Sequence, residues 1–372
     1  METDTTKVSI VIINYNGVVY LPKLFESIAK QTFRQFEVLV WDNNSSDNSL
    51  KWLNDSKPKF PLKIIANEQN LGFGKAINRA ILQAKGQHIC LLNNDTYVSQ
   101  NLLEILYNQV VIDDVDVVGP KILFAGSYFD VLVNGPKAAY VKSLPYLSHP
   151  NRFKTFINND DPFKRLTRTG RINIKKGDRL QMTIGESIAL PNTFFWDSSS
   201  NSKVETDTHR LTSLLIQCTI TPNQVEKHII NSTGLIINDK NGKARDRGIF
   251  EYDVGQYNSY DRVDGLSGCC FMIKKDLFKS IGFDENYFMY YEDVDFFVRL
   301  RQQYKKTKVV YCPEATVFHY NGSINQSSKI RFINKSHLTF VRKHFGARTY
   351  LTFYLMYCYS RILNFLRYII SN

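Results

Sequence analysis

The sequence predicts an α/β protein built on a doubly wound, mostly parallel sheet, and three observations support this fold class. Short continuous apolar runs alternate with stretches of helical periodicity near the N-terminus, as expected for buried strands joined by helices. Polar and acidic residues follow directly after these runs, where ligands of such sheets bind. A chain of 372 residues is long enough for a large core and more than one domain.

The expected elements of this sheet follow one another along the N-terminal part of the chain. Residues 8–13 form an almost continuous apolar run, as in a strand that is buried on both faces. Leu21, Leu24 and Ile28 repeat at helical spacing, and Asp47 lies in the capping region of the next helix. The expected elements are strand 8–13, helix 17–31, strand 36–41, helix 46–53, strand 62–66, helix 74–85 and strand 88–92.

Four loops place small polar or acidic groups at the carboxyl ends of these strands. The loops are residues 14–16, 42–47, 70–75 and 93–96. Because the strands are expected to be parallel, the loops should meet along one rim of the sheet. No GxxxxGK or GxGxxG pattern follows the first strand, so neither a P-loop nor a dinucleotide-binding domain is predicted.

Three carboxylates, those of Glu292, Asp293 and Asp295, lie close together where an amphipathic helix is expected to begin. Acidic residues favour a helix N-terminus because the macrodipole is positive there. Asp295 could also simply pair with Arg299 at i,i+4. Taken alone, the triplet would indicate no more than this, and only its place after the polar loops of the rim favours a catalytic role.

Composition and charge restrict the partners and the compartment. The net charge of +12 favours anionic partners such as nucleoside diphosphates, lipid phosphates or an anionic membrane surface. Nucleic acid is not expected, because zinc-finger spacing and basic-aromatic recognition motifs are missing. The six cysteines form no CxxC pair, and residues 1–7 lack the apolar core of a signal peptide. The sequence therefore predicts reduced thiols in a cytoplasmic protein.

Seven segments carry a resemblance to a known family. They are SIVIINYNG (9–17), VLVWDNNSSDNS (38–49), NLGFGKAINRA (70–80), LLNNDTYV (91–98), GLSGCCFMI (265–273), GFDENYFMYYEDVD (282–295) and VYCPEATVFH (310–319). Together, and in this order, they resemble family 2 glycosyltransferases with the GT-A fold, most closely the rhamnosyltransferase-like branch. The resemblance covers about half of the chain.

The resemblance implies a nucleotide-sugar site on the rim. Its residues would be Asn14, Tyr15, Asn16, Asp42, Asn70, Gly72, Lys75, Asn78, Asn93, Asn94 and Asp95. Asp42 would accept a hydrogen bond from the base imide N–H, although an aspartate here also suits a tight turn. Lys75 or Arg79 would meet the base or the pyrophosphate, or else lie on a solvated helix face. The implied donor is a deoxythymidine- or uridine-diphosphate sugar, with L-rhamnose as the sugar.

A divalent metal ion, Mg²⁺ or Mn²⁺, is also implied by the resemblance. The loop Asn93-Asn94-Asp95 takes the place of the family's DxD motif, which leaves Asp95 as its metal-binding carboxylate. Hard cations that take up the charge of a diphosphate prefer oxygen ligands. His319 would be a second ligand through its neutral imidazole. Both residues also have a structural interpretation, in a turn and at a strand end.

The resemblance also implies a role for each of the three carboxylates, Glu292, Asp293 and Asp295. An inverting transferase needs one base to take the proton of the acceptor hydroxyl as it attacks the anomeric carbon. Asp293 would be this base, Glu292 would orient the acceptor, and Asp295 would pair with Arg299 or the helix. Repulsion from Glu292 and Asp295 is expected to raise the pKa of Asp293. The acceptor would be a glycan or a lipid-linked glycan.

The middle and the end of the chain depart from the family pattern. The domains expected are the nucleotide-sugar half over 1–123, an inserted β-rich, sandwich-like module over 124–230, the catalytic half over 231–325 and a helical segment over 326–372. A hairpin with an Asn-Gly turn is expected at 235–245. The tail mixes aromatic residues with Arg361 and Arg367, which suits peripheral contact with a membrane, core packing or a homodimer.

Two other classes of function remain open at this point. A sugar-phosphate nucleotidylyltransferase would need a Gly-rich loop after the first strand, and Asn14-Tyr15-Asn16-Gly17 is not such a loop. A non-catalytic glycan-binding protein on a relic fold would not need to keep both Asp95 and Asp293. Turnover of a nucleotide sugar in the presence of Mn²⁺ would separate the three classes.

Overall fold

The computed structural model describes residues 6–125, residues 228–320 apart from 239, 250 and 252, and the helices over 326–370. Between 126 and 227 it describes only the backbone of short strands. The chain divides into two compact units. One consists of Met1–Ala125 with Ile230–Ile370, and the other is Gly126–Ile229.

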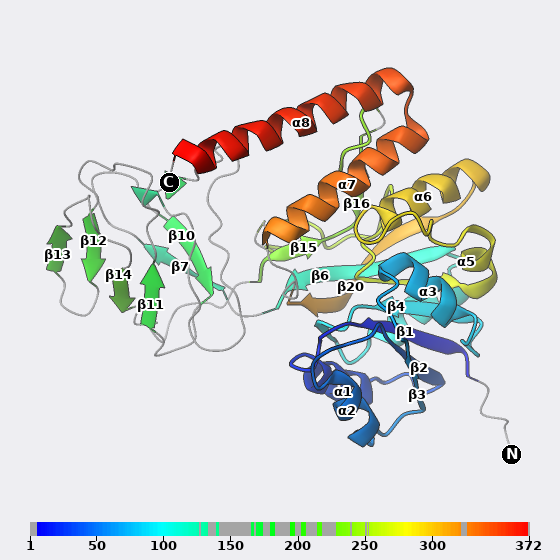
Figure 1. Ribbon diagram of the computed structural model, residues 1–372. Coiled ribbons are helices and arrows are strands. Elements are labelled where there is room, and N and C mark those ends of the chain that lie inside the picture. Colours follow the sequence, from blue (N-terminus) through cyan, green and yellow to red (C-terminus); the bar gives the residue numbers. More distant parts are fainter. Residues whose placement is uncertain are drawn as a thin grey trace, which may run out of the picture. The chain divides into compact units, whose positions relative to one another are not determined.

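A ten-stranded mixed sheet forms the centre of the first unit (Figure 1). Its main order is β18-β20-β6-β19-β4-β1-β2-β3, with β15 paired to β6 and β5 paired to β20. The strands are β1 (Val8–Asn14), β2 (Phe36–Asp42), β3 (Leu62–Ala66), β4 (His88–Leu92), β5 (Thr96–Val98), β6 (Val117–Phe124), β15 (Ile230–Ser232), β18 (Asp261–Arg262), β19 (Cys270–Lys274) and β20 (Val309–His319). The pairings among β1 to β4 and between β20 and β6 are parallel, whereas β19 runs antiparallel to both of its neighbours. The predicted α/β class with a mostly parallel sheet is therefore confirmed.

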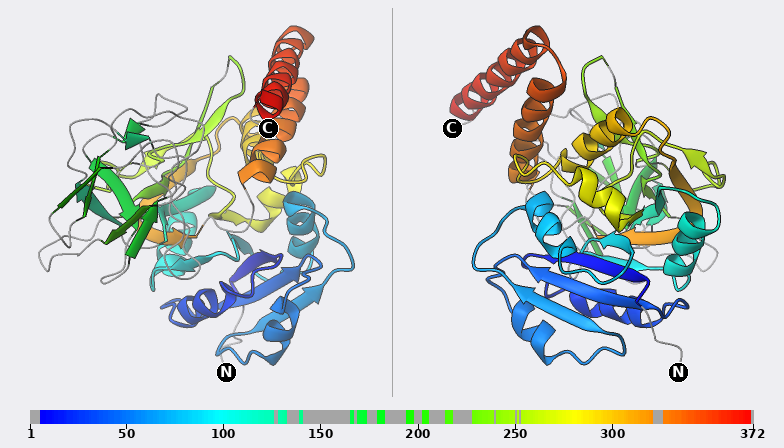
Figure 2. Two further views of the ribbon diagram at one scale, coloured as in Figure 1. Left: turned by 60° about the vertical axis from the view of Figure 1, so that its left-hand side comes forward. Right: turned by 90° about the vertical axis from the view of Figure 1, so that its right-hand side faces the viewer.

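Helices cover both faces of this sheet (Figure 2). They are α1 (Leu21–Ala29), α2 (Ser49–Asp55), α3 (Phe73–Ile81), α4 (Leu102–Val111), α5 (Lys275–Ile281) and α6 (Glu292–Gln303). Alternate residues of β1 enter two different cores, because successive side chains of a strand point to opposite faces. Ile10 and Ile12 pack with α1 and α4, whereas Val11 and Ile13 pack with α3, α5 and α6. The two cores hold the carboxyl ends of the strands in place from both sides.

The hairpin expected at 235–245 is present as β16 (Leu235–Ile237) and β17 (Ala244–Asp246), which pair antiparallel. Gly242 has φ +67° at its turn, a conformation that favours glycine. The hairpin brings Asp246 opposite Leu235. It therefore delivers a carboxylate that the sequence analysis did not single out.

Within Gly126–Ile229 the structure describes short strands that pair antiparallel in twos. The pairs are β7 (Tyr128–Leu132) with β10 (Thr169–Asn173), β8 (Ala139–Tyr140) with β9 (Arg165–Leu166), β11 (Arg179–Met182) with β14 (Leu214–Gln217), and β12 (Phe194–Asp197) with β13 (Ser202–Glu205). Their joining into a sandwich-like module remains a prediction from the sequence.

Two long helices end the chain, α7 (Gln326–His344) and α8 (Ala347–Ile370). Phe340 and Val341 of α7 are buried in the first unit. Along α8, Leu351, Tyr354 and Leu355 are exposed by 44–57%. Among the helices that the structure describes, none combines the length and the apolar character that crossing a membrane would require.

Candidate active site

The ends of β1, β2 and β4 meet at one rim, where their polar side chains are joined by hydrogen bonds. Asn14 and Asp42 are register partners, and Asn14 Nδ2 donates to Asp42 Oδ2 at 2.7 Å. Asn94 Nδ2 donates to Asn14 Oδ1 at 2.8 Å. Ser45 gives Asp42 its backbone N–H at 2.9 Å and its hydroxyl at 2.7 Å. A carboxylate has about four acceptor sites, so these three donors leave room for one further donor, such as a base imide.

The loop at 70–75 connects this rim to the acidic segment. Asn43 Nδ2 donates to Asn70 Oδ1 at 2.8 Å and to Gly72 O at 3.0 Å. Gly72 has φ +79°, and a Cβ at this position would lie 2.4 Å from Phe288 O. Phe73 N donates to the same oxygen at 2.9 Å. Glycine is required here because the two backbones approach too closely for a side chain.

The other residues predicted to bind the nucleotide differ in their exposure and in their hydrogen-bond partners. Tyr15 is 44% exposed, and Asn16 Oδ1 accepts a hydrogen bond from Ser46 N at 2.7 Å. The amide of Asn78 exchanges two hydrogen bonds with the main chain of Phe283, at 2.8 and 2.9 Å. Lys75 pairs with Glu285 at 3.6 Å. Lys75 and Asn78 thus connect α3 to the 283–285 segment, and a role for either in nucleotide binding remains a prediction.

The two predicted metal ligands are neighbours. Asp95 is buried, and its Oδ1 lies 3.1 Å from His319 Nε2. The other ring nitrogen, His319 Nδ1, lies 3.3 Å from Asn231 Oδ1. Burial alone would lower the pKa of His319, but the Cys269 thiol and the Asp95 carboxylate raise it well above its usual value. The imidazolium form of His319 is therefore favoured while Asp95 and Cys269 are its neighbours.

The loop 93–95 suits a divalent cation that is shared with a substrate. Asn93 Oδ1, in the same loop as Asp95 and two residues before it, is buried without a hydrogen-bond partner. No group of three or more His, Cys, Asp or Glu in the described ranges could hold a metal ion by itself. Mg²⁺ and Mn²⁺ are usually held by one or two carboxylates together with water and substrate phosphates. The residues present therefore fit a metal ion that binds together with a diphosphate.

Glu292 and Asp293 are presented by a strained turn. Tyr290 and Tyr291 both have φ +66°, which is uncommon for residues with large side chains. α6 begins at Glu292, where the sequence placed a helix start. Gly268 N donates to Asp293 Oδ2 at 2.9 Å, and Val294 N donates to Asp293 Oδ1 at 2.8 Å.

The pKa values of the two carboxyls are raised. Burial is the main cause for both, and the charge of Asp293 adds to the rise at Glu292. Glu292 Oε2 is buried and has no hydrogen-bond partner. The expected repulsion from Asp295 is not the cause of the shift at Asp293, because Asp295 is neutralised by cations elsewhere. A buried carboxyl with a raised pKa suits general base chemistry near neutral pH.

Asp295 is fully buried and pairs with two cationic side chains and one histidine. Arg299 Nε lies 2.6 Å from it, which confirms the predicted i,i+4 pair. Lys343 Nζ at 2.9 Å and His344 Nε2 at 2.7 Å reach it from α7. Burial would raise the pKa of Asp295, but hydrogen bonds from His344, Lys343 and Arg299 lower it to about 2. The sequence analysis did not predict the contacts of Lys343 and His344 with Asp295, because these two residues lie almost fifty positions after Asp295 in the chain.

Two further residues near the site, Asp246 and Lys329, were not predicted from the sequence. Asp246 Oδ1 is buried without a hydrogen-bond partner, and burial raises the pKa of this carboxyl to about 6, with a further rise from Asp293. Lys329 Nζ lies over the Tyr290 ring, 5.8 Å from its centroid. The Asn-Gly turn of the hairpin was a usable signal for the placement of Asp246. No local pattern marks Lys329.

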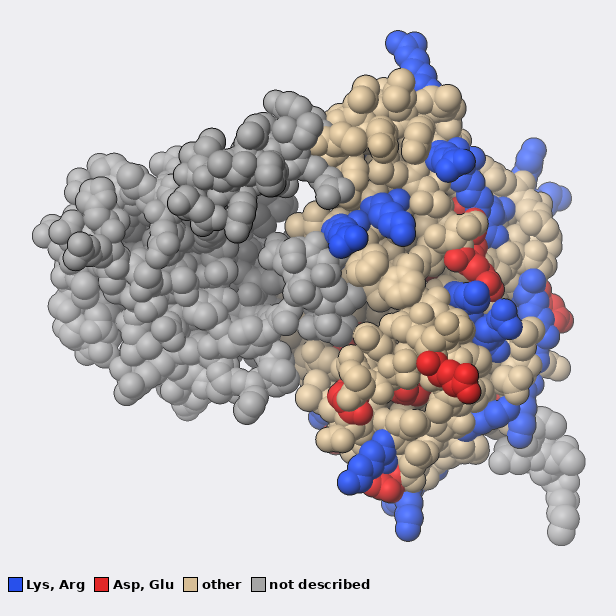
Figure 3. Space-filling view, viewed as in Figure 1, with Lys and Arg blue, Asp and Glu red and all other residues tan. Residues whose placement is uncertain are grey.

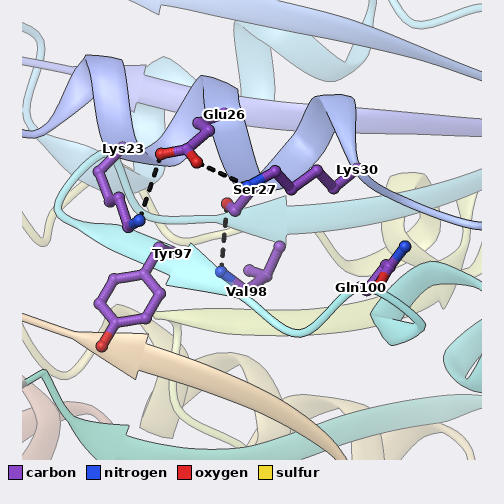
Figure 4. Close-up of a pocket in the computed structure, with 7 residues that line it drawn as sticks. All are labelled: Lys23, Glu26, Ser27, Lys30, Tyr97, Val98 and Gln100. Atoms are coloured by element: carbon purple, nitrogen blue, oxygen red, sulfur yellow. Dashed lines mark hydrogen bonds and ion pairs between the residues drawn. The ribbon is translucent and has the colours of Figure 1, made fainter.

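A shallow surface hollow lies apart from these carboxylates, between α1 and β5 (Figure 4). It is lined by Lys23, Glu26, Ser27, Lys30, Tyr97, Val98 and Gln100. Glu26 pairs with Lys23 at 3.2 Å and with Lys30 at 2.6 Å, so its charged groups already pair with one another. The chemistry of the site therefore belongs to the rim and not to this hollow.

Residues 9–173 match the family model described as Glycosyl transferase family 2. The glycosyltransferase GlyG of Streptococcus pneumoniae serotype 4 is 34% identical over 116 residues, which are 30% of this chain and 37% of GlyG. The poly(ribitol-phosphate) beta-N-acetylglucosaminyltransferase TarS of Staphylococcus aureus is 35% identical over 101 residues, 26% of this chain and 18% of TarS. The crystal structure of TarS 1–349 with UDP-GlcNAc has a TM-score of 0.30 and 30% identity, over 37% of this chain and 39% of that chain.

Residues 9–173, a little under half of this chain, are therefore similar to the glycosyl transferase family 2 model, and both curated relatives are glycosyltransferases. The matched segments span well under two thirds of the length of these curated relatives, 37% of GlyG and 18% of TarS. The family match includes Asn14, Asp42 and Asp95 and ends before the segments that hold Asp293 and His319. Neither name mentions rhamnose.

Proposed function

We propose that this protein is an inverting, metal-dependent glycosyltransferase that moves a sugar from a nucleoside-diphosphate sugar to a hydroxyl of a glycan or lipid-linked glycan. One observation carries the proposal. Gly268 N–H holds Asp293 at 2.9 Å, while the adjacent Cys269 accepts a hydrogen bond from Asn93 N at 2.9 Å. Two neighbouring residues therefore connect the proposed base to the proposed metal loop.

Asp293 is the base of this reaction. The acceptor oxygen attacks the anomeric carbon, its proton passes to Asp293, and the bond from that carbon to the diphosphate oxygen breaks with the electron pair going to the diphosphate. Each Asp293 oxygen accepts one backbone N–H in the structure, which fixes the carboxylate and leaves acceptor sites for the hydroxyl. Glu292, buried beside it, orients the acceptor.

Asp95 and His319 are the residues that would hold the metal ion, and Asn93 Oδ1 is a buried neutral oxygen of the same loop as Asp95. A bound Mg²⁺ or Mn²⁺ would neutralise charge on the departing diphosphate. Asp42 keeps about one acceptor site for a base imide N–H, which favours uridine or deoxythymidine diphosphate. The resemblance to the rhamnosyltransferase-like branch makes L-rhamnose the first sugar to test.

Residues 124–230 and the tail complete the proposal. The β-rich segment would bind acceptor glycan, bind another subunit or brace the enzyme. The exposed apolar residues of α8 would hold the protein at the cytoplasmic face of a membrane, near a lipid-linked acceptor. Lys and Arg side chains are spread over the displayed face of the described residues, including the helices at the end of the chain (Figure 3). Attraction to anionic lipid would then add to apolar contact.

The test is a panel of nucleoside diphosphates and their sugars with Mn²⁺. Ligands of the nucleotide pocket should raise the melting temperature through linkage, and a matching nucleotide sugar should be turned over. Asp95→Ala should abolish metal-dependent stabilisation by the diphosphate, and His319→Ala should weaken it less. Activity that survives a chelator would contradict the metal-dependent mechanism, and turnover of no nucleotide sugar would contradict the transferase.

A further inference from the structure

α7 packs along the segment that leads to the proposed base. The rings of Phe332 and Phe288 stack with their centroids 5.5 Å apart. Tyr291 lies 5.5 Å from the ring of Phe340, which is buried. Ser336 Oγ donates to the backbone of the same segment at 2.8 Å. The helix therefore has a fixed place beside the site.

The first part of α7 brings one lysine to the carboxylates. Lys329 Nζ lies over the ring of Tyr290, two residues before Glu292. Burial lowers the pKa of Lys329, whereas the carboxylates of Asp246 and Asp95 act in the opposite direction. A cation that is partly removed from water and held beside an aromatic face interacts more strongly with an anion than a solvated one does.

We propose that Lys329 binds the diphosphate of the nucleotide-sugar donor and stabilises the charge that this group gains as the glycosidic bond breaks. The inference rests on the proposed function and adds a ligand from α7 to it. When the bond from the anomeric carbon to the diphosphate oxygen breaks, the electron pair remains on that oxygen. The ammonium then faces a more negative group than in the ground state.

The composition of the metal loop explains why an additional cation is needed. Asn93 stands where the family motif has an acid, so Asp95 is the loop's one carboxylate toward the metal ion. A metal ion with fewer charged ligands is held less tightly. Lysine supplies a compact positive charge that suits phosphate oxygens and does not depend on metal occupancy. Preorganised charge of this kind stabilises a transition state without reorganisation.

The experiment is calorimetric titration of the full chain with UDP and with UMP, with and without Mn²⁺, repeated with dTDP and dTMP. Lys329→Met should weaken binding of the diphosphate about 10- to 100-fold, the range for a hydrogen bond to a charged group. It should weaken the monophosphate much less, so that the ratio of the two affinities falls. Lys329→Arg should restore most of the ratio. Lys335→Met, at an exposed position of the same helix, is the matched control and should change neither affinity.

Two results would overturn the inference while leaving the proposed function intact. Lys329→Met could bind the diphosphate as tightly as wild type, or it could lose diphosphate and monophosphate in equal measure, as a merely structural lysine would. Wild-type protein that binds no nucleoside diphosphate would overturn both proposals together. If Lys329→Met does not fold, Lys329→Gln is judged by the same affinity ratio.

Discussion

The two sides of the candidate site are built in different ways. On the nucleotide side, Asn14 and Asp42 end β1 and β2, and Asn94 lies two residues after β4. Hydrogen bonds of 2.7–2.8 Å connect their side chains. On the catalytic side, Glu292 and Asp293 follow two residues with positive φ, in a segment that a distant helix holds in place. The first side is secured by local geometry, and the second depends on the tertiary fold.

The carboxylates on the two sides are also suited to different chemical roles. The rim carboxylate Asp42 accepts three hydrogen bonds, which fix its orientation and suit a group that recognises a ligand by hydrogen bonding. Glu292 keeps a buried oxygen without a partner, and burial raises the pKa values of Glu292 and Asp293. Carboxyl groups whose pKa is raised by burial are suited to accept a proton near neutral pH. The comparison therefore predicts that changes on the catalytic side affect turnover more than nucleotide binding.

The largest expected effect comes from Asp293→Asn. This change removes the proton acceptor but keeps the shape of the side chain, so turnover should fall on the order of 10²–10⁴-fold. Affinity for the nucleotide sugar should change little, because the rim is untouched. The measurements are single-turnover kinetics and calorimetry. Asp276→Asn, at an exposed position of α5, is the control, and near-wild-type turnover by Asp293→Asn would remove this residue from the mechanism.

The next effect is on stability and concerns Asp295→Asn. Removing the Asp295 charge takes away the buried anion that Arg299, Lys343 and His344 share, and leaves only Asp284, at 2.6 Å from Lys343 Nζ, to pair with this cluster. The free energy of unfolding should fall by about 3–5 kcal/mol. Chemical denaturation of wild type and variant measures this difference. A loss below about 1 kcal/mol would show that the cluster does not hold α7 against the site.

The same cluster has a defined pH dependence. The folded pKa of Asp295 is about 2, which is lower than the usual 3.8. Its stabilising contribution is therefore complete above the unfolded pKa and is lost as the pH falls from about 4 toward 2. The stability difference between wild type and Asp295→Asn should shrink by about 2 kcal/mol over this window. A difference that stays constant down to pH 2 would contradict the lowered pKa.

A smaller effect is expected where the two sides meet, at Gly72→Ala. A methyl group would lie 2.4 Å from Phe288 O, and the backbone has φ +79°. Strain and displacement of the 288–291 segment should cost about 1–3 kcal/mol of stability and lower turnover. Gly346→Ala is the matched control, because its Cβ would meet no atom within 4 Å. Equal melting temperatures for the two variants would mean that the contact between the loops is dispensable.

The features that the sequence predicted correctly are those that depend on residues close together in the chain. The end of β1 at Asn14, the end of β2 at Asp42, the start of α6 at Glu292 and the Asp295–Arg299 pair all have local patterns. The contacts of Asp295 with α7 have no such pattern, because they join residues far apart in sequence and depend on tertiary packing. The position of Lys329 near the site likewise has no local pattern, because it depends on how α7 packs against the rest of the first unit.

The smallest effect is expected at the chain's end, where α8 exposes several large apolar residues. Leu351, Tyr354 and Leu355 share one helical face and are 44–57% exposed. Burying them in a lipid interface should contribute about 1 kcal/mol or more per side chain, which gives weak, reversible binding. A variant with Leu351→Ser and Leu355→Ser should float less with anionic vesicles than wild type.

Two controls distinguish a membrane surface from the other ways of covering this face. Neutral vesicles should bind less protein than anionic ones, because the chain carries a net charge of +12. Light scattering of wild type and of the double serine variant tests for a dimer through the same face. Wild-type protein that does not float with anionic vesicles, but loses a dimer when Leu351 and Leu355 become serine, would assign α8 to self-association. The lipid-linked acceptor would then have to reach the site without help from the tail.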